Sequence, residues 1–173
     1  DILRRAGVDV VTLGVTGEYI TGAHDIVVKA DKPLSYAVKE DIDAAIISTH
    51  ADGHYEIAKK LLEKGVSIYI DKPLTYNLEK SMEIEALAKE KNLIAMVGFN
   101  RRFCPKIKEL KAKGNAHIIV MEKNREYPPG DIRRFVVEDF IHVVDTLRFL
   151  IGEDVKSMDI NFSKEGNNLN NVV

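Results

Sequence analysis

The stretch AAIISTHADGHYEIAKKLLEKGVSIYIDKP, residues 44–73, decides the fold class of this chain. It begins with a short apolar run that ends in Ser48 and Thr49, a pattern typical of a buried strand. Residues 55–64 then place apolar side chains at helical spacing. Residues 66–70 are rich in β-branched residues, which favour a second strand. The order strand, helix, strand predicts a βαβ unit with parallel strands.

The same alternation continues towards the carboxyl end. Residues 77–88 carry an apolar stripe at helical spacing, and residues 94–98 form a third apolar run. Strands separated by helices of about 10 to 15 residues predict an α/β fold with a Rossmann-type parallel sheet and right-handed crossovers. In such sheets the ligand binds beyond the carboxyl ends of the strands. We therefore expect the functional residues of this part to lie where the strands end.

The second half of the chain predicts a different architecture. We expect helices at residues 106–113 and 138–151, strands at residues 117–121 and 155–162, and a turn at residues 166–171. This order predicts the start of an α/β domain with a mostly antiparallel sheet. The sequence thus divides into a domain at residues 1–102, whose first βα unit is atypical or missing, and the beginning of a second domain at residues 103–173.

The first 41 residues contain two features that bear on function. Residues 8–13 could form a strand, but the GVTG that follows at residues 14–17 is not the G-x-G-x-x-G turn that grips a diphosphate. In addition, DKPLSY at residues 31–36 nearly repeats as DKPLTY at residues 71–76. The second copy is the better functional candidate, because it lies at the end of a predicted strand and is followed by a helix and another strand.

Composition excludes several classes of function. The 173 residues are 45% hydrophobic and 30% charged, with a formal net charge of -2, which gives no basic face for nucleic acid. Cys104 is the single cysteine, so no intrachain disulfide can form, and a cytoplasmic setting fits this usage. No apolar run approaches the roughly 18 to 20 residues that span a bilayer. The chain does not begin with Met, and we expect it to be incomplete at both ends.

Lys72 is the first candidate for chemistry. A lysine at the carboxyl end of a parallel strand points towards the ligand crevice, and Pro73 restricts its backbone to an extended conformation. A partly desolvated lysine has a lowered pKa and can exchange a proton with a hydroxyl or a carbonyl. The alternative interpretation is an ordinary surface lysine before a turn.

Glu138, His142 and Asp145 form a second candidate group. Their spacing of i, i+4 and i+7 places them on one face of a helix. An imidazole flanked by two acids suits proton transfer. The alternatives are a solvated helix face and a metal site, but no other cluster supplies obvious completing ligands, so we expect no metal.

Polar residues also follow the other strands. Thr49 and His54 lie where a helix begins, and a helix N-terminus favours anions. Asn100 and Arg101 follow the third strand, where an arginine could bind phosphate or carboxylate. Turn formation and ordinary surface charge explain the same residues equally well.

Three motifs in this order resemble one known family. They are DKPL at residues 71–74, VGFNRRFCP at residues 97–105 and EDFIHVVD at residues 138–145. Together they are similar to the glucose–fructose oxidoreductase, inositol dehydrogenase and rhizopine-catabolism family (Gfo/Idh/MocA), most of all to its virulence-factor-like branch. The resemblance covers about residues 42–162.

The resemblance implies an NAD(P)-dependent oxidoreductase built from a dinucleotide-binding Rossmann domain and a sheet domain that often forms an oligomer interface. The substrate would be a sugar, a cyclitol or a related polyol. Lys72 matches the family lysine that contacts the nicotinamide and the substrate hydroxyl, His142 matches the catalytic histidine, and Glu138 and Asp145 match flanking acids. The expected cofactor-binding residues are Ser48, Thr49, His54, Asp71, Lys72, Pro73, Asn100 and Arg101.

Two departures from the family pattern keep other interpretations open. Asp71 stands where glutamate is more frequent, and the first 41 residues show neither the glycine-rich turn nor an acid for the adenosine ribose. The rivals are a non-catalytic sugar-sensing or regulatory member, an assembly subunit and a metal hydrolase. The sequence does not choose between NAD and NADP, nor between Lys72 and His142 as the group that transfers the proton.

Overall fold

A computed structural model describes residues 2–21, 25–39, 41–114, 116–123, 131–166 and 168–172. The chain forms two compact units, each continuous in space but not in sequence. Unit 1 consists of Asp1–Ile70 and Glu79–Met96, and unit 2 consists of Asp71–Leu78 and Val97–Val173. The division into domains at residues 1–102 and 103–173 stays a prediction.

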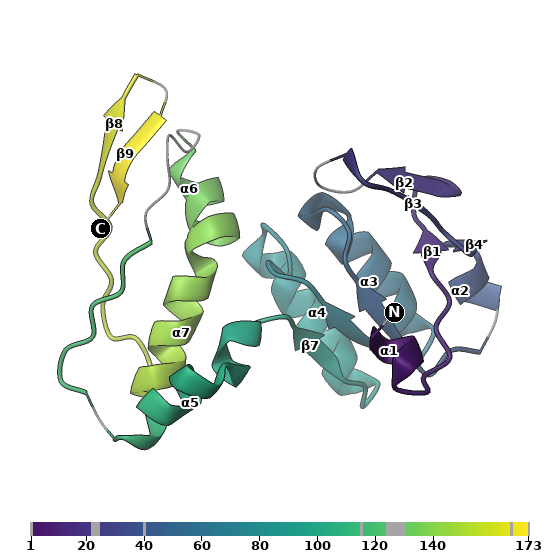
Figure 1. Ribbon diagram of the computed structural model, residues 1–173, viewed down its shortest axis with the longest axis horizontal. Helices are drawn as coiled ribbons and strands as arrows, with labels where there is room; N and C mark the ends of the chain where they lie inside the picture. Colours follow the sequence, from purple (N-terminus) through teal and green to yellow (C-terminus); the bar gives the residue numbers. More distant parts are fainter. Residues whose placement is uncertain are drawn as a thin grey trace. The chain divides into compact units, whose positions relative to one another are not determined.

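Unit 1 is built on a parallel βαβ arrangement (Figure 1). Strands β5 (Ala44–Ile47), β6 (Ser67–Ile70) and β7 (Ala95–Val97) form one sheet in that order, joined by helices α3 (His54–Glu63) and α4 (Leu78–Glu90). Strands β5 and β6 pair in parallel, with Ala44 opposite Ser67. The α/β fold class predicted from the alternating pattern is therefore confirmed.

The core of unit 1 follows from the periodicity of these elements. Ile68 and Ile70 are buried on alternate positions of β6, while Leu62 comes from the buried face of α3 and Ile84 from α4. Burying one such side chain stabilises the fold by roughly 1.5–3 kcal/mol. This core fixes the carboxyl end of β6, after which Asp71 and Lys72 follow.

The first part of unit 1 consists of short elements. They are α1 (Ile2–Arg5), β1 (Leu13–Gly14), β2 (Tyr19–Thr21), β3 (Val27–Lys29), β4 (Lys32–Pro33) and α2 (Tyr36–Lys39). The strand expected at residues 8–13 is reduced to two residues, and β2 follows it with no helix between them. A Cβ atom at Gly14 would lie 1.8 Å from the carbonyl oxygen of Gly17, so this turn closes tightly on its own backbone. The strand, turn and helix of a diphosphate grip are thus absent from residues 13–21.

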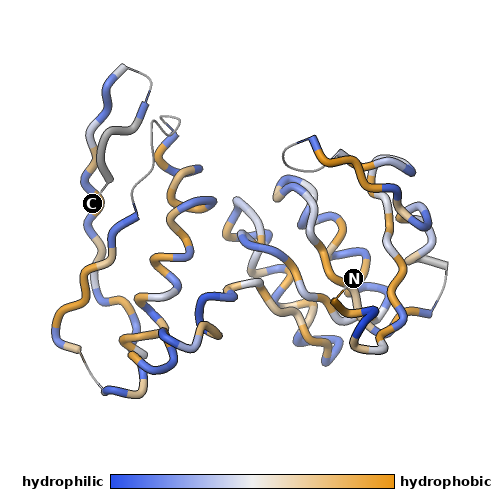
Figure 2. The backbone as a smooth tube through the Cα atoms, viewed as in Figure 1, coloured by the Kyte–Doolittle hydropathy of each residue, from blue (hydrophilic) through white to orange (hydrophobic). Residues whose placement is uncertain are grey.

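Unit 2 combines helices with a β-hairpin. Its elements are a 3₁₀ turn (Asn100–Phe103), α5 (Pro105–Ala112), α6 (Ile132–Arg134), a π-helical segment (Phe135–Phe140), α7 (Ile141–Ile151), β8 (Phe162–Glu165) and β9 (Asn168–Val172). Helices α5 and α7 pack together, and β8 and β9 form an antiparallel pair (Figure 1). Figure 2 shows both hydrophobic and hydrophilic residues along α7, as expected for a helix that is buried on one side.

Three predictions for unit 2 are wrong. Residues 117–121 form no strand, and residues 155–161 are exposed and irregular, so the strand begins only at Phe162. Residues 168–171, which belong to the turn predicted at residues 166–171, lie in β9. An alternating sequence becomes a strand only where a partner supplies hydrogen bonds, and here Gly166, with φ of 58°, turns the chain so that β9 is the partner of β8.

None of the helices in the described part of the chain has the length and apolar composition needed to cross a bilayer.

Candidate functional site

Lys72 is held against the helix that carries His142. Strand β6 ends at Ile70, and the chain then turns through Asp71 and a cis peptide bond between Lys72 and Pro73. The Lys72 ammonium is half-buried, and its Nζ donates a hydrogen bond to the backbone carbonyl of Glu138 over 2.7 Å. Residues 66 positions apart in the sequence therefore meet within unit 2.

The helix is π-helical at this point, and two of its carbonyls accept hydrogen bonds from lysine side chains. In a π-helix the backbone hydrogen bonds run from residue i+5 to residue i, so the regular α-helical pairing is interrupted. The Glu138 carbonyl accepts from Lys72, and the next carbonyl, that of Asp139, accepts from Lys123. Lys123 also lies 3.4 Å from the Asp139 carboxylate. Two ammonium groups thus bind successive carbonyls one turn before His142.

The Glu138 side chain is held by its own partners. The Tyr76 hydroxyl donates to Glu138 Oε1, and the Arg134 Nε donates to the same oxygen over 3.1 Å. Arg133 in turn donates to the backbone carbonyl of Tyr76 over 3.0 Å. The Glu138 carboxylate therefore links the segment after β6 to the π-helical segment, and it already accepts two hydrogen bonds.

His142 is half-buried at the start of α7, and its Nδ1 has no hydrogen-bond partner among the described residues. Burial lowers the pKa of His142 below its ordinary value of 6.5, because the charged imidazolium loses solvation. The positive charges of Arg101, Lys72 and Lys123 lower this pKa further, while the charge of Asp71 opposes them. The imidazole is therefore neutral at neutral pH and able to accept a proton.

The Asp145 carboxylate binds an arginine, whereas its spacing from His142 suggested a part in proton transfer. The buried carboxylate accepts hydrogen bonds from Arg102. The Arg102 Nε lies 2.9 Å from each carboxylate oxygen, and the Arg102 Nη2 donates to Oδ1. The hydrogen bond to Asp145 raises the pKa of Arg102. The Arg102 guanidinium also lies 5.6 Å from the ring centroid of Phe99 and 5.9 Å from that of Phe149. This pair joins the 3₁₀ turn to α7.

The structure separates the three side chains that the sequence placed on one helix face. Glu138 contacts Tyr76, His142 lies among positive charges, and Asp145 binds Arg102. The π-helical segment ends between the first and the second of these residues, so the regular i, i+4 spacing does not apply there. Sequence reasoning missed Tyr76 and Lys123. The near-repeat ending in Tyr76 could have indicated it, whereas Lys123 carries no local signal.

The strand-end residues of unit 1 form a compact turn. Ser48 is exposed after β5, and the Thr49 Oγ1 donates to the His50 carbonyl over 3.3 Å. His54 is 1% exposed, and its Nε2 donates to the Thr49 carbonyl over 3.0 Å. His54 therefore connects the first turn of α3 to the end of β5.

The expected cofactor-binding residues of unit 2 differ in exposure. Asp71, Asn100 and Arg101 are exposed, while Pro73 is buried. Their cofactor-binding roles stay predictions.

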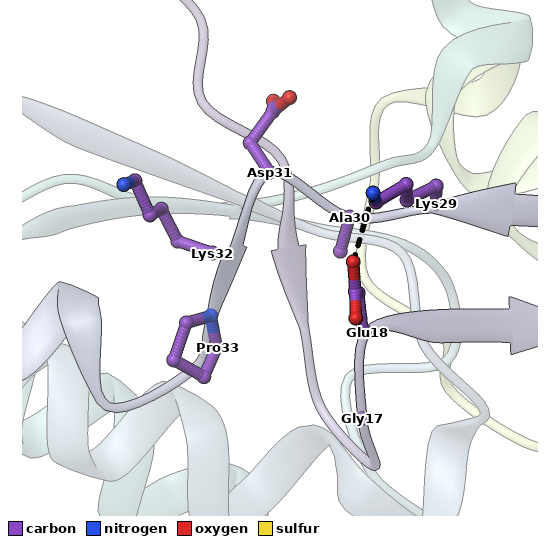
Figure 3. A pocket seen from close by; sticks show the side chains of 7 residues that line it. All are labelled: Gly17, Glu18, Lys29, Ala30, Asp31, Lys32 and Pro33. Atoms are coloured by element: carbon purple, nitrogen blue, oxygen red, sulfur yellow. Dashed lines mark ion pairs between the residues drawn. The ribbon is translucent and has the colours of Figure 1, made fainter.

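The first copy of the DKP motif lines a separate hollow in unit 1, of about 640 Å³ (Figure 3). Its charged groups already have partners. Glu18 and Lys29 form an ion pair of 2.9 Å, and Lys32 lies 5.9 Å from the ring centroid of Tyr36. The Asp31 carboxylate binds the side chains of Arg4 and Thr12 and the Thr12 amide. Within the described part of the chain, Glu18, Lys29 and Asp31 are therefore paired with opposite charges, while Lys32 contacts a ring. Among the described residues, no group of three or more His, Cys, Asp and Glu side chains is placed to hold a metal ion.

Comparison with known proteins identifies the family. Residues 18–99 match the model of an oxidoreductase family with an NAD-binding Rossmann fold. The chain is 40% identical over 117 residues to the putative oxidoreductase YceM of Salmonella typhimurium. This match covers 66% of this chain and 38% of that protein. The chain belongs to the Gfo/Idh/MocA family of oxidoreductases.

Further members of the family extend the match. The scyllo-inositol 2-dehydrogenase (NAD(+)) of Bacillus subtilis is 33% identical over 149 residues, which are 79% of this chain and 42% of that protein. The crystal structure of a Gfo/Idh/MocA family oxidoreductase from Vibrio cholerae superposes with a TM-score of 0.69 at 28% identity, covering 82% of this chain and 48% of that one. The chain thus spans less than half the length of the family members it matches here.

Proposed function

We propose that this chain is part of an NAD(P)-dependent oxidoreductase that transfers a hydride between a nicotinamide cofactor and a hydroxyl carbon of a polyol, sugar or cyclitol. Membership of an NAD-binding oxidoreductase family and relatives named as inositol dehydrogenases support this proposal. The observation that carries it is the contact of 2.7 Å between the Lys72 ammonium and the Glu138 carbonyl, one turn before His142.

The described residues fit the nicotinamide side of such a cofactor better than its diphosphate side. We assign cofactor contacts to Ser48, Thr49, His54, Asp71, Lys72, Pro73, Asn100 and Arg101, the residues at the carboxyl ends of β5, β6 and β7 and in the turns that follow them. The residues after β1 form no glycine-rich grip, so no diphosphate contact is assigned there. When bound, the nicotinamide supplies the hydride acceptor.

The roles of the chain's own residues follow from their protonation and partners. Lys72 would donate a hydrogen bond to the substrate oxygen and hold it in place. His142, whose pKa is lowered by burial, would accept the hydroxyl proton as the carbinol carbon loses its hydride. Glu138 and Asp145 are assigned positioning roles, because their carboxylates bind Tyr76 and Arg102 respectively.

The family resemblance also supports a cytoplasmic location and assembly into a homo-oligomer. Both are part of the proposal, and sedimentation velocity of the purified protein would test the second.

The missing glycine-rich turn favours one other candidate, a family member that binds a sugar for sensing or regulation without a dinucleotide. Titration of the protein with NADH and NADPH, followed by nucleotide fluorescence, separates the two. Saturable binding supports the oxidoreductase, and its absence in the complete protein supports the sensing function.

The decisive experiment is turnover of scyllo-inositol with NAD⁺ by variants at the two proposed positions. General acid–base participation is worth about 100- to 10,000-fold in rate, so Lys72→Ala and His142→Ala should each lower kcat by at least about 100-fold. The matched control is Lys32→Ala, which alters the first DKP copy and should leave kcat unchanged. Turnover close to the unmodified protein in both Lys72→Ala and His142→Ala would rule out the assigned roles.

A further inference from the structure

Two side chains of the loop after β6 bind one and the same residue of the π-helical segment. Lys72 and Tyr76 belong to unit 2, as does Glu138. The Lys72 Nζ donates to the Glu138 carbonyl over 2.7 Å, and the Tyr76 hydroxyl donates to Glu138 Oε1. The loop therefore holds Glu138 at its main chain and at its side chain, so a displacement of this residue changes both contacts together.

The contact between Tyr76 and Glu138 is reinforced from both ends. Glu138 Oε1 also accepts from the Arg134 Nε over 3.1 Å, and the backbone carbonyl of Tyr76 accepts from the Arg133 Nη2 over 3.0 Å. Tyr76 and Glu138 are half-buried, whereas the two arginines are exposed. A hydroxyl bound to an ionised carboxylate forms a stronger hydrogen bond than two neutral groups do, and partial burial limits competition from water. The Tyr76 hydroxyl is thus well placed to fix Glu138.

The orientation of Lys72 depends on where the Glu138 carbonyl lies. An ammonium carries three N–H donors at the end of a flexible four-carbon stem. The carbonyl accepts from one of these donors and thereby sets the direction of the others. Because ordering a lysine side chain costs much rotamer entropy, a single neutral acceptor orients it effectively only if the acceptor itself is fixed.

The first copy of the DKP motif shows that local sequence does not create this arrangement. Its Lys32 and Tyr36 have the same spacing as the pair in the second copy, but the Lys32 ammonium lies 5.9 Å from the ring centroid of Tyr36. In the second copy the lysine and the tyrosine both reach Glu138, which lies 62 positions beyond Tyr76. The shared acceptor, supplied by a distant segment, is what distinguishes the second copy.

We propose that Tyr76 is a positioning residue of the candidate site. Its hydroxyl fixes Glu138, and the Glu138 carbonyl in turn aims the Lys72 ammonium at the substrate oxygen. The proposal rests on the proposed function, since it concerns the orientation of Lys72 in that same site. Tyr76 acts only through Glu138 and contacts neither substrate nor cofactor. Its loss should therefore lower turnover by misorienting Lys72 rather than by weakening substrate binding.

Steady-state kinetics with scyllo-inositol and NAD⁺ test the route through Lys72. Tyr76→Phe keeps the ring and deletes the hydroxyl, and it should lower kcat roughly 10- to 100-fold with KM changed by less than about two-fold, because misorientation acts in the transition state. In a Lys72→Met background the same substitution should cause no further loss, since the group through which it acts is gone. The control is Tyr55→Phe, which deletes the hydroxyl of another tyrosine–glutamate pair, 2.6 Å from Glu83 in unit 1, and should leave kcat unchanged.

Competitive acetylation of the cofactor-free protein, followed by mass spectrometry, provides a readout that does not require turnover. Only an amine that has left its hydrogen-bond acceptor reacts, and loss of one hydrogen bond shifts such an equilibrium about five-fold. Tyr76→Phe should therefore raise the acetylation rate of Lys72 by about five-fold. Glu138→Ala retains the carbonyl but removes the carboxylate, and it should raise the rate equally. Lys106, an exposed lysine on α5 of the same unit, is the internal control and should keep its rate in both variants.

The outcomes decide between positioning and general stability. An unchanged Lys72 rate in both variants overturns the proposal, and so does a rise shared equally by Lys106, which would indicate a loosened fold. Kinetic losses that add in the double variant of Lys72→Met and Tyr76→Phe also overturn it, while turnover by the unmodified protein retains the oxidoreductase. A rise confined to Lys72 in a protein that oxidises no polyol supports the positioning of Lys72 and refutes the proposed function.

Discussion

At the scale of single residues, His142 shows how burial and charge act together on one group. Burial and the three cations Arg101, Lys72 and Lys123 all disfavour the imidazolium, and Asp71 alone favours it. A proton acceptor of this kind works at a lower pH than an unperturbed histidine would allow.

The lowered pKa of His142 predicts how kcat/KM falls on the acid side of its pH profile (the acid limb). Below the folded pKa of His142 the imidazole is protonated and cannot act as a base, so kcat/KM should fall at a pH below the 6.5 of an ordinary histidine. Lys123→Gln removes one repelling charge and should move both the limb and the imidazole titration to higher pH, and Asp71→Asn should move the titration to lower pH. The imidazole proton resonances of His142, followed by NMR, provide the measurement. A midpoint at or above 6.5 would contradict the prediction.

The ion pair between Arg102 and Asp145 predicts an asymmetry in stability. Asp145 is 4% exposed in its side chain and Arg102 is 40% exposed, so only the arginine can be hydrated when its partner is removed. Arg102→Ala should therefore cost about 3–5 kcal/mol of unfolding free energy, because a buried carboxylate is left unpaired. Asp145→Ala should cost less, about 1–3 kcal/mol. Urea unfolding measures both values.

A surface pair on α7 is the control for this asymmetry. Arg148 lies 3.9 Å from Asp154, and both side chains are exposed. Arg148→Ala should cost about 0–1 kcal/mol, as is usual for solvated pairs. Equal losses for Arg102→Ala and Asp145→Ala would show that burial does not control the energy of the inner pair.

At the scale of elements, α7 ends at a glycine that adopts a left-handed conformation. Gly152 has φ of 76°, and its amide donates to the Arg148 carbonyl over 2.9 Å. A Cβ atom at this position would also lie 2.6 Å from the Lys111 Nζ, which itself binds the Leu150 carbonyl. Gly152→Ala should therefore lower the free energy of unfolding by about 1–2 kcal/mol.

The matched control is Gly53, which precedes α3 with an ordinary helical φ of -88°. A Cβ atom there would meet its nearest side-chain atoms, from Ile57 and Thr49, at 3.7 Å, which is normal contact. Gly53→Ala should leave stability unchanged or raise it by up to about 1 kcal/mol. Thermal unfolding of the two variants compares them, and a larger loss at Gly53 would refute the account of the helix end.

At the scale of the whole molecule, the backbone amides of different segments should differ in their protection against hydrogen exchange. In unit 1, β6 pairs with β5 and packs against α3, whose Leu62 is fully buried. In unit 2, residues 154–161 are exposed and make no backbone hydrogen bonds with other described residues. Such amides open at little cost in free energy.

Hydrogen exchange followed by mass spectrometry should show this contrast. Peptides that cover residues 154–161 should exchange within seconds at neutral pH, whereas peptides from α3 and β6 should stay protected at least about 100-fold longer. Slow exchange at residues 154–161 would mean that this segment has a partner in solution, and the description of it as irregular would be wrong.

The sequence by itself determined the βαβ arrangement of unit 1 and the helices on either side of the candidate site. Periodicities of 3.6 and 2 residues record which face of an element is buried, so elements at residues 44–49, 55–64 and 66–70 could be predicted without coordinates. The structure has them at Ala44–Ile47, His54–Glu63 and Ser67–Ile70. The motifs after the strands also indicated Lys72 and His142. Strands at residues 117–121 and 155–162 were predicted wrongly, because a strand depends on a partner that local sequence does not specify.

Only the tertiary structure decided what each side chain contacts. The carbonyl that receives Lys72, the hydroxyl that holds Glu138 and the guanidinium that binds Asp145 all come from distant parts of the chain. The π-helical segment was not predicted either, since an α-helix and a π-helix can share one apolar pattern and differ in their packing. Local periodicity encodes elements, whereas partners separated by tens of residues are fixed by the folded chain.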